Sequence, residues 1–269
     1  MTTTLDPLYE SIREEAQAVA AAAEPFAVEA DAMSTAHEGI RKILTDSQLW
    51  RLTVPSRWGG RFEQVDPLAV CVVREVLMAT SSHLDSMFAL QGIGSFGLAL
   101  GGSDALRDEW LPKVASGEVL AALGLTEEDA GSDLKNIVTE VRPGADGLVL
   151  NGNKAFISNG GAAGFYSVLA KENDGLSLFL VPADAPGLSV TPTPEIIAPH
   201  ILADLRFDNV VLDEGFRIGE PGKAMDLVLA TLAMFRVSVA GASVGLAQAA
   251  LDEAARHAGA RIQFGRPLA

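Results

Sequence analysis

The stretch Ser116-Gly117-Glu118-Val119-Leu120-Ala121-Ala122-Leu123-Gly124-Leu125-Thr126 marks the place where the hydrophobic pattern of this chain changes. Before it, apolar residues recur at the spacing of helices. After it, from Val119 to about Val211, short runs rich in β-branched and aromatic residues are separated by Gly, Asp, Asn and Pro. The change predicts a helical part followed by a β part.

The part before residue 116 is expected to contain several helices. Apolar residues recur at helical spacing from Leu8 to Val19, which predicts an amphipathic helix. Asp66 is a good N-cap and is followed by Pro67 at the first helical position, so a helix is expected over residues 67–79. Further helices are expected over residues 37–48, 86–100 and 104–114, the last with Ser103 as its N-cap.

The β part reads as short strands joined by turn residues. Asp146-Gly147 and Asn151-Gly152 are typical turn pairs, so strands near residues 137–142, 147–150 and 154–158 are expected to form a meander. Further strand-like runs lie at residues 119–125, 167–170, 176–181, 188–191 and 203–207. Together they predict a small antiparallel β domain.

A helical pattern returns beyond Gly222, with one long segment from about residue 224 to residue 258 and no internal proline. The order of helices, strands and a long helix favours an α+β fold with segregated layers over alternating βαβ units. We expect an N-terminal helical domain over residues 1–116 and a middle antiparallel β domain over residues 117–219. A C-terminal helical domain begins at residues 220–269.

Composition excludes several classes of function. The 269 residues are 48% hydrophobic and carry a net charge of −15, which disfavours nucleic acid and anionic membranes as partners. The single Cys71 cannot form an intrachain disulfide and lies in an apolar run, so a cytoplasmic protein with a buried thiol is expected. The start of the chain does not resemble an export signal.

Neither a membrane span nor a metal site is expected. The most apolar stretch, Leu227–Phe235, is well short of the roughly 20 residues that cross a bilayer, and it predicts a buried helix. The four histidines, His37, His83, His200 and His257, show no metal-ligand spacing.

The first candidate motif is Thr126-Glu127-Glu128-Asp129-Ala130-Gly131-Ser132-Asp133, which follows an apolar strand. A tight turn at the end of a strand presents backbone N–H groups and two hydroxyls, which suit phosphate oxygens or the carbonyls of a heterocycle. The alternative is a hydrophilic loop in which Ser132 and Asp133 cap a turn.

The second motif is Asn151-Gly152-Asn153-Lys154-Ala155-Phe156-Ile157-Ser158-Asn159-Gly160, read as a turn, a short strand and another turn. Phe156 and Ser158 project to the same side of a strand. An aromatic face beside a hydroxyl suits a stacked heteroaromatic ring that is polarised at one nitrogen. The alternative places Phe156 in the core and Ser158 in a turn.

The third candidate region is the long C-terminal helix. Arg236 interrupts its apolar run, and a buried guanidinium there would need a carboxylate, a phosphate or water. Arg261, Gln263 and Phe264 close the helix with donors and an aromatic ring. The helix dipole also favours a cation at this end, so Arg261 has a structural alternative.

Taken together, these motifs resemble the acyl-CoA dehydrogenases, and the resemblance covers nearly the whole chain. That family has an N-terminal helical domain, a middle β domain and a C-terminal helical bundle, usually as a tetramer with FAD between the β domain and the helices. Here the resemblance implies one long helix of an incomplete C-terminal bundle. It rests on residues 54–60, 126–133, 151–160, 241–253 and 261–268.

The resemblance implies a set of flavin contacts in the β domain. Leu123, Leu125 and Thr126 would contact the flavin ring. Gly131 and Ser132 would contact the ribityl and pyrophosphate region, and Ser132 would also lie near the acyl substrate.

Phe156, Ile157 and Ser158 form the other half of the implied flavin site. Phe156 stands where the family commonly has Trp against the isoalloxazine, and Ser158 where it has Thr or Ser bonding the flavin N5. Arg236 is the second implied substrate-binding residue.

Arg261, Gln263 and Phe264 match the segment that reaches the FAD of a neighbouring subunit in the family. The resemblance therefore implies an oligomer, either of identical chains or with a second chain that supplies the rest of the bundle.

Family chemistry removes a proton from the acyl α carbon with a Glu and passes a hydride from the β carbon to flavin N5. That base lies in the C-terminal bundle or, in some members, directly before the arginine matching Arg236. This chain has Phe235 there. No catalytic residue is therefore assigned, and we expect the base from a partner chain or from a missing C-terminus.

Two further departures affect the implied substrate. Glu128-Asp129 stand where the family generally has Pro-Gly, and Ala233 stands where an acidic residue of the CoA site is common. A carrier-protein thioester is therefore an alternative to a CoA thioester.

Three functions stay open on the sequence. The first is an FAD-dependent acyl thioester dehydrogenase that passes electrons to an electron-transfer flavoprotein or to oxygen. The second is a noncatalytic flavin-binding or assembly subunit. The third is a flavin monooxygenase on the same fold.

Overall fold

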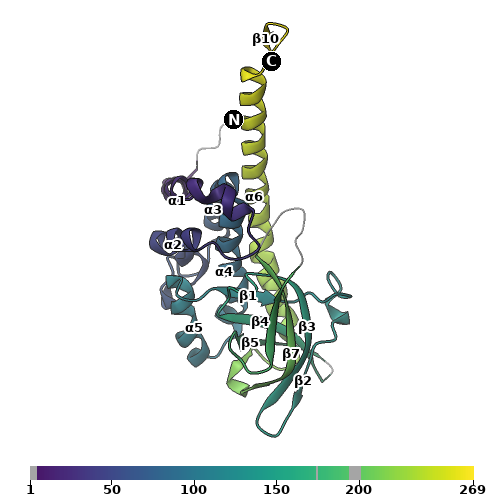
Figure 1. The fold of residues 1–269 in the computed structure, drawn as a ribbon. Helices are drawn as coiled ribbons and strands as arrows, with labels where there is room; N and C mark the ends of the chain where they lie inside the picture. The colour runs from purple at the N-terminus through teal and green to yellow at the C-terminus, as the bar shows by residue number, and fades with distance from the viewer. Residues whose placement is uncertain (1–4, 174, 194–200) are drawn as a thin grey trace.

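The computed structural model describes residues 5–173, 175–193 and 201–269. A layer of helices lies against a β sheet, and one long helix, α6, runs past both and projects beyond them (Figure 1). The predicted order of helices, strands and a long helix is confirmed, and so is the α+β class.

Five α-helices form most of the described N-terminal part, and the predicted caps are confirmed. The Asp66 carboxylate accepts hydrogen bonds from the N–H groups of Leu68 and Ala69, and the Ser103 hydroxyl accepts one from Leu106. These caps satisfy donors that a helix start leaves free. The helices are α1 (Pro7–Asp31), α2 (Glu38–Ser47), α3 (Pro67–Thr80), α4 (Ser82–Gly101) and α5 (Asp104–Ser116).

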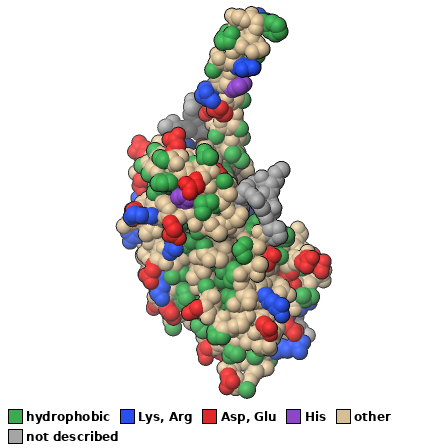
Figure 2. Space-filling view, in the orientation of Figure 1, with side chains coloured by type: hydrophobic (Ala, Val, Ile, Leu, Met, Phe, Trp, Pro, Cys, Tyr) green, Lys and Arg blue, Asp and Glu red, His purple; other side chains and the backbone are tan. Residues whose placement is uncertain are grey.

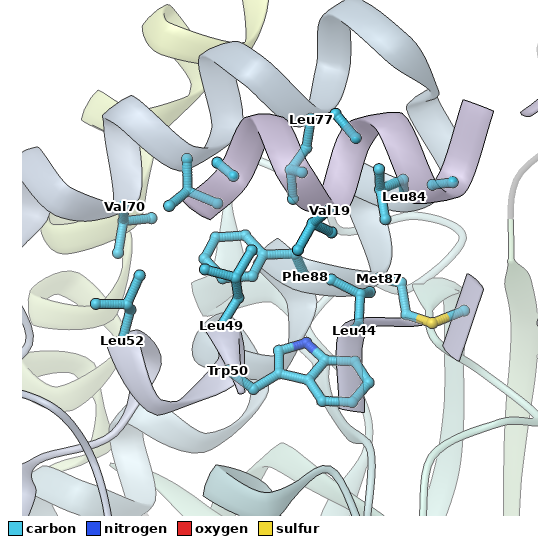
Figure 3. Packing of buried hydrophobic residues seen from close by; sticks show 14 of the residues in the cluster. Val19, Leu44, Leu49, Trp50, Leu52, Val70, Leu77, Leu84, Met87 and Phe88 are labelled. Atoms are coloured by element: carbon cyan, nitrogen blue, oxygen red, sulfur yellow. The ribbon is translucent and has the colours of Figure 1, made fainter. Parts of the chain in front are cut away.

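The core of the helical part is built around Trp50 and Phe88, whose side chains are fully buried. Figure 3 shows these rings among aliphatic side chains from α1 to α4 and from the short helix η1 (Leu49–Thr53). Phe235 of α6 joins the same cluster. Hydrophobic burial thus ties the long helix to the N-terminal helices.

The β part is an eight-stranded sheet in the order β6-β7-β3-β2-β4-β5-β8, with β1 paired to β4. Most neighbours are antiparallel as predicted, but β1 and β2 run parallel to β4. The strands are β1 (Ala121–Gly124), β2 (Glu140–Pro143), β3 (Leu148–Ser158), β4 (Phe165–Glu172), β5 (Gly175–Pro182), β6 (Leu188–Pro192), β7 (Leu202–Leu212) and β8 (Arg217–Ile218).

One predicted turn is wrong. Asp146-Gly147 does turn the chain between β2 and β3, but Asn151-Gly152 lies inside the continuous strand β3. A Cβ atom at Gly152 would lie 2.5 Å from the Thr139 Cα atom, and the φ of Gly152 is 138°. The glycine therefore serves a close approach within the sheet, a common role of glycine in strands.

The helical layer holds β1 through α4. The buried Gln91 side chain donates to the carbonyls of Val114 and Val119 and accepts from the Ala121 N–H. A Cβ atom at Gly94 would lie 2.5 Å from the Ala122 nitrogen. Strand β1 therefore lies directly on the backbone of α4. This contact determines the position of the C-terminal end of β1, where the candidate loop begins.

The helix α6 (Ala224–Ala260) packs closely on α3. A Cβ atom at Gly241 would lie 2.5 Å from the Cys71 carbonyl oxygen, and one at Gly245 would lie 1.8 Å from that of Glu75. The small residues let the two backbones meet. The predicted buried helix is thus confirmed only for the side that faces α3 and α4.

By length and composition α6 could also cross a membrane. The stretch Leu227–Phe235, the only one that the sequence prediction considered, is too short to do so. Its most apolar window has a mean hydropathy of 1.8, and 28% of that window is buried in the fold. A core helix of a soluble protein can be equally long and equally apolar. The contacts with α3 show that part of α6 is packed inside the fold.

Beyond α6 the chain forms a small hairpin of β9 (Ile262–Gln263) and β10 (Arg266–Pro267). Phe264 and Gly265 form its turn, with φ values of 52° and 79°. The hairpin lies at the projecting tip of the helix (Figure 1).

Candidate functional site

The loop after β1 is a closed turn with open space beside it. The N–H of Glu127 donates to the Ala130 carbonyl at 3.0 Å, and the N–H of Ala130 donates back to the Glu127 carbonyl at 3.2 Å. Gly131 and Ser132 are exposed, and no atom lies within 4 Å of where a Gly131 Cβ would be. A bound group can therefore approach this backbone closely.

Strand β3 contains a bulge that turns Phe156 outward. The pairing of β3 with β7 shifts between Lys154 and Ile157. Phe156 has a φ of 57° and its side chain is 56% exposed. The Asp204 carboxylate of β7 accepts a hydrogen bond from the Phe156 N–H at 3.1 Å. A bulky residue in the left-handed region is strained, and such strain clusters at functional sites.

Two hydrogen bonds bring the loop and the bulge together. The Ala155 N–H donates to the Thr126 carbonyl at 2.9 Å, and the Asn159 side-chain amide donates to the Ala121 carbonyl at 3.2 Å. Residues 121–126 and 155–159 therefore run side by side in opposite directions. Phe156 and Ser158 consequently lie beside the last residues of β1.

The predicted flavin contacts of the β domain thus fall at one edge of the sheet. Leu123, Thr126 and Ser158 are half-buried at this edge, and Ser158 has an interaction partner within the fold. Ile157, between Phe156 and Ser158, points into the core with 2% exposure, whereas Phe156 is exposed and Ser158 is half-buried. Ile157 can therefore offer a bound group only its backbone. The bulge interrupts the alternation of β3, so a common face for Phe156 and Ser158 stays a prediction.

Leu125 is likewise buried, and its side chain belongs to the core between α4, α5 and the sheet. Its carbonyl accepts a hydrogen bond from the Lys154 ammonium at 3.0 Å. Leu125 is therefore a supporting residue of the loop, with limited surface for a ligand.

A buried ion pair lies directly behind the loop. The Lys154 Nζ atom is 2.9 Å from the Glu127 Oε1 atom. Burial lowers the pKa of Lys154, and the Glu127 carboxylate opposes that shift. Burial on its own raises the pKa of Glu127, but hydrogen bonds from Thr139, Lys154 and Val138 hold it below its usual value. The carboxylate is thus ionised at neutral pH.

No hydrogen bond among the described residues links Arg236 to this edge of the sheet. It is exposed on α6 and forms no ion pair with the described residues, so of the three partners that the sequence left open, water is the one available to it within the described part of the chain. Its neighbour Phe235 is buried and meets Phe96 edge to face, with ring centroids 5.6 Å apart. Helix geometry turns consecutive residues to different sides, which separates the two.

Arg261, Gln263 and Phe264 lie far from the sheet edge. They occupy the hairpin at the tip of α6, and Phe264 is fully exposed (Figure 1). Arg261 is the residue after the last helical turn and begins the hairpin. Within one chain these residues do not meet the loop after β1.

Sequence reasoning missed three residues that hold the site together, namely Glu127, Lys154 and Asp204. A usable signal exists for Lys154: Leu148, Leu150 and Lys154 alternate along β3 and share its buried face. A lysine on a buried face needs a carboxylate partner. Asp204 gave no such signal, because its contact depends on the bulge in the neighbouring strand.

The chemistry available at this edge is that of a binding site. It offers an exposed aromatic face, hydroxyls and the exposed loop backbone of Gly131 and Ser132. The carboxylates of Glu128 and Asp129 are exposed in the same loop. No group of three metal-ligating side chains exists among the described residues, which exclude His200.

Three family models match almost end to end. The model described as acyl-CoA dehydrogenase, N-terminal domain matches residues 7–118, the middle domain matches residues 122–210, and the C-terminal domain matches residues 222–269.

Curated relatives carry related names. A protein of Mycobacterium leprae named as a probable acyl-CoA dehydrogenase is 32% identical over 251 residues, which cover 91% of this chain and 64% of the relative. Cyclohexane-1-carbonyl-CoA dehydrogenase of Geobacter metallireducens is 33% identical, with coverage of 91% and 66%. The chain thus spans slightly less than two thirds of the length of these relatives.

Solved structures agree with the fold. Butyryl-CoA dehydrogenase of Megasphaera elsdenii has a TM-score of 0.91 at 26% identity, covering 100% of this chain and 73% of the other. A glutaryl-CoA dehydrogenase of Mycobacterium smegmatis, solved in complex with FADH2, has a TM-score of 0.90 at 25% identity, with coverage of 98% and 68%. With its fold, its site edge and all three family models in agreement, the chain belongs to the acyl-CoA dehydrogenase family.

Proposed function

We propose that this chain binds FAD and forms the flavin half of an acyl thioester dehydrogenase. The observation that carries the proposal is the 2.9 Å hydrogen bond from the Ala155 N–H to the Thr126 carbonyl. It joins the open loop after β1 to the outward-turned Phe156. An aromatic face and backbone N–H groups that suit a phosphate therefore lie at one edge.

The residues at this edge fit the parts of FAD. Phe156 offers its exposed ring to the isoalloxazine, and Thr126 and Ser158 offer hydroxyls to the polar ring atoms. Gly131 and Ser132 offer backbone N–H groups and a hydroxyl to the pyrophosphate. Bound FAD would supply the hydride acceptor for oxidation of the acyl chain.

The chain's own residues would bind and orient the flavin, and the proton would be removed by a base from elsewhere. Phe235, the residue before Arg236, is buried against α4 and has no acidic group. We propose that a partner chain, or sequence C-terminal to residue 269, supplies this carboxylate. A general base must lie within hydrogen-bond reach of the proton that it takes.

An acyl thioester is the proposed substrate, with Ser132 and Arg236 as its contacts. Arg236 is an exposed cation without a partner among the described residues, so it is free to meet an anionic or carbonyl group. The exposed Glu128 and Asp129 would repel a CoA phosphate, which supports a carrier-protein thioester as the alternative. An electron-transfer flavoprotein or oxygen would take the electrons.

An oligomer is the proposed state. Phe264 is fully exposed, and Val244, Leu246 and Leu251 of α6 are exposed in the described part of the chain. Figure 2 shows apolar side chains on the surface of the projecting helix. Surface of this kind marks an interaction site. A copy of the chain, or a chain carrying the rest of a helical bundle, would cover it. A cytoplasmic location remains proposed, supported by the single cysteine.

Flavin binding is the first test. The purified chain is incubated with FAD, separated from free cofactor, and its visible absorption spectrum is recorded. We expect bound FAD for the chain and a loss of about tenfold or more in affinity for Phe156→Ala, because the ring face is removed. Phe26→Ala is the control, since it removes a partly exposed phenyl ring from α1. Absence of bound flavin in the unmodified chain would refute the proposal.

Anaerobic addition of an acyl-CoA then tests catalysis. Bleaching of the flavin would show dehydrogenation by the chain itself. Bound flavin without bleaching favours the noncatalytic flavin-binding subunit, a candidate supported by Phe235 at the position of a base. Oxygen consumption by the reduced protein with substrate hydroxylation would instead identify a monooxygenase.

A further inference from the structure

The ion pair of Lys154 and Glu127 is almost completely removed from water. Lys154 is 1% exposed and Glu127 is 7% exposed. Both lie behind the edge where the proposed flavin contacts meet. A buried charge pair of this kind gives little net stability, because both ions lose their hydration. Its position therefore calls for an explanation other than stability.

The pair connects four backbone segments. The Lys154 ammonium donates to the Leu125 carbonyl at 3.0 Å and to the Glu127 carboxylate at 2.9 Å. The two oxygens of that carboxylate accept from the Val138 N–H at 2.6 Å and the Thr139 N–H at 3.0 Å. The end of β1, the loop, the segment before β2 and strand β3 thus meet at two side chains.

The attachment points lie next to the proposed flavin contacts. Leu125 and Glu127 flank Thr126, and Lys154 is two residues before Phe156. The Lys154 side chain therefore fixes the distance between the loop and the bulge. A charge-assisted bond is stronger and more directional than a neutral one, and a rigid site loses less entropy when it binds a ligand.

We propose that Lys154 and Glu127 are positioning residues of the flavin site, which hold the loop 126–132 against the Phe156 bulge and thereby set the affinity for flavin. This inference rests on the proposed function. The pair does not touch the flavin. It keeps the flavin contacts in register before the cofactor arrives.

The test separates positioning from stability with three variants, Lys154→Met, Glu127→Gln and the double variant. Each single variant leaves one buried charge or donor without its partner and is expected to destabilise the protein. The double variant removes both charges and keeps one amide oxygen, which can accept from one of the Val138 and Thr139 N–H groups. It is expected to regain much of the lost stability.

The FAD dissociation constant is the decisive measurement, taken by fluorescence titration beside urea unfolding of the cofactor-free protein. Positioning predicts that the double variant keeps a dissociation constant at least about tenfold above wild type although its stability recovers, since the tether to Leu125 is gone. A dissociation constant that recovers together with stability would overturn the inference.

A matched control exists in the helical part. Arg74 of α3 and Asp85 of α4 form a buried bidentate pair, with nitrogen–oxygen distances of 2.9 and 2.6 Å. The variant Arg74→Met/Asp85→Asn removes a comparably buried pair, whose hydrogen bonds join α3 to α4 and, through Ser238, to α6. It is expected to lower stability and to leave FAD affinity within about twofold to threefold of wild type. An equal loss of affinity in this control would show that any buried pair has the same effect.

Glu127→Asp keeps the test usable if the single variants do not fold. It preserves the charge but withdraws the carboxylate by one methylene, so FAD affinity should fall while the chain stays folded. If a folded Glu127→Asp variant and the double variant both keep the FAD affinity of wild type, the positioning inference is rejected and the proposed function still stands. Failure of wild type to bind FAD would reject the proposed function as well.

Discussion

At the scale of single residues, Phe156 is the most informative position. A phenylalanine with positive φ and a half-exposed ring is costly to the fold on both counts. The bulge in β3 and the Asp204 carboxylate together hold this backbone in place. Strain that is supported in this way is typical of a residue kept for binding.

Removal of the Asp204 carboxylate is expected to loosen the bulge. Asp204→Ala leaves the Phe156 N–H without its acceptor and also frees the Thr193 hydroxyl, which bonds the same oxygen at 3.2 Å. We predict FAD binding weaker by about fivefold or more, because loss of one such hydrogen bond costs about 1 kcal/mol or more. Equilibrium titration with FAD measures it.

Asp208→Ala is the control for Asp204→Ala. Asp208 also lies on β7 and is exposed, so its substitution by alanine removes the same charge from the same strand. Equal effects of the two substitutions would mean that charge, and not support of the bulge, is responsible.

At the scale of elements, the junction of α5 and β1 determines where the site edge lies. Gly117 ends α5 with a φ of 75°, and its N–H donates to the Val114 carbonyl. A Cβ atom there would lie 2.4 Å from the Trp50 ring. The glycine thus satisfies a left-handed helix end and a close contact with the core at once.

Gly117→Ala is expected to destabilise the protein by about 2 kcal/mol or more, because it adds strain at positive φ and a clash with Trp50. Urea unfolding monitored by tryptophan fluorescence provides the measurement.

The matched control for this substitution is Gly259→Ala. Gly259 lies in α6 with nothing within 4 Å of its would-be Cβ. It should be neutral or stabilise slightly, since alanine favours a helix. Equal stability of the two variants would contradict the role assigned to Gly117.

At the scale of the whole molecule, the projecting helix separates two halves of the proposed flavin site. Helix α6 has 37 residues and is therefore about 55 Å long. The loop after β1 lies near the body of the molecule and the hairpin at the helix tip (Figure 1). A second copy could bring its hairpin to the first copy's loop.

Mixing two defective variants tests this arrangement. Arg261→Ala/Phe264→Ala removes the hairpin contacts, and Phe156→Ala/Ser158→Ala removes the contacts of the sheet edge. If hairpins act on a neighbouring copy, co-expressed variants should regain about one intact site in four, because mixed dimers contain one complete site. The bound FAD per chain measures the result. A mixture that binds only the average of the two variants would show that the hairpin does not act in this way.

The sequence allowed the helices to be predicted closely, because their signals are local. Asp66-Pro67 and Ser103 mark helix starts by their own side chains. The turn at Asn151-Gly152 was wrong for the opposite reason. Glycine is needed there because the backbone of Thr139, 13 residues earlier in the chain, lies too close for a side chain. No local pattern distinguishes this steric requirement from a turn.

The candidate site was found from the sequence only in its parts. The motifs at residues 126–133 and 156–158 could be named, because they are contiguous and resemble a family pattern. The support from Asp204, and the pairing of Lys154 with Glu127, needed the fold. These contacts join residues 27 and 48 positions apart.

The sequence by itself determined the order of helices and strands, the caps that begin the helices and the residue types of the flavin motifs. Each of these depends on interactions within a few neighbouring residues. The tertiary structure decided that β1 runs parallel to β4, that Phe156 turns outward and that Lys154 is buried against Glu127. The physical reason is that parallel pairing, bulges and buried charges are set by the packing of distant segments, which no local pattern specifies.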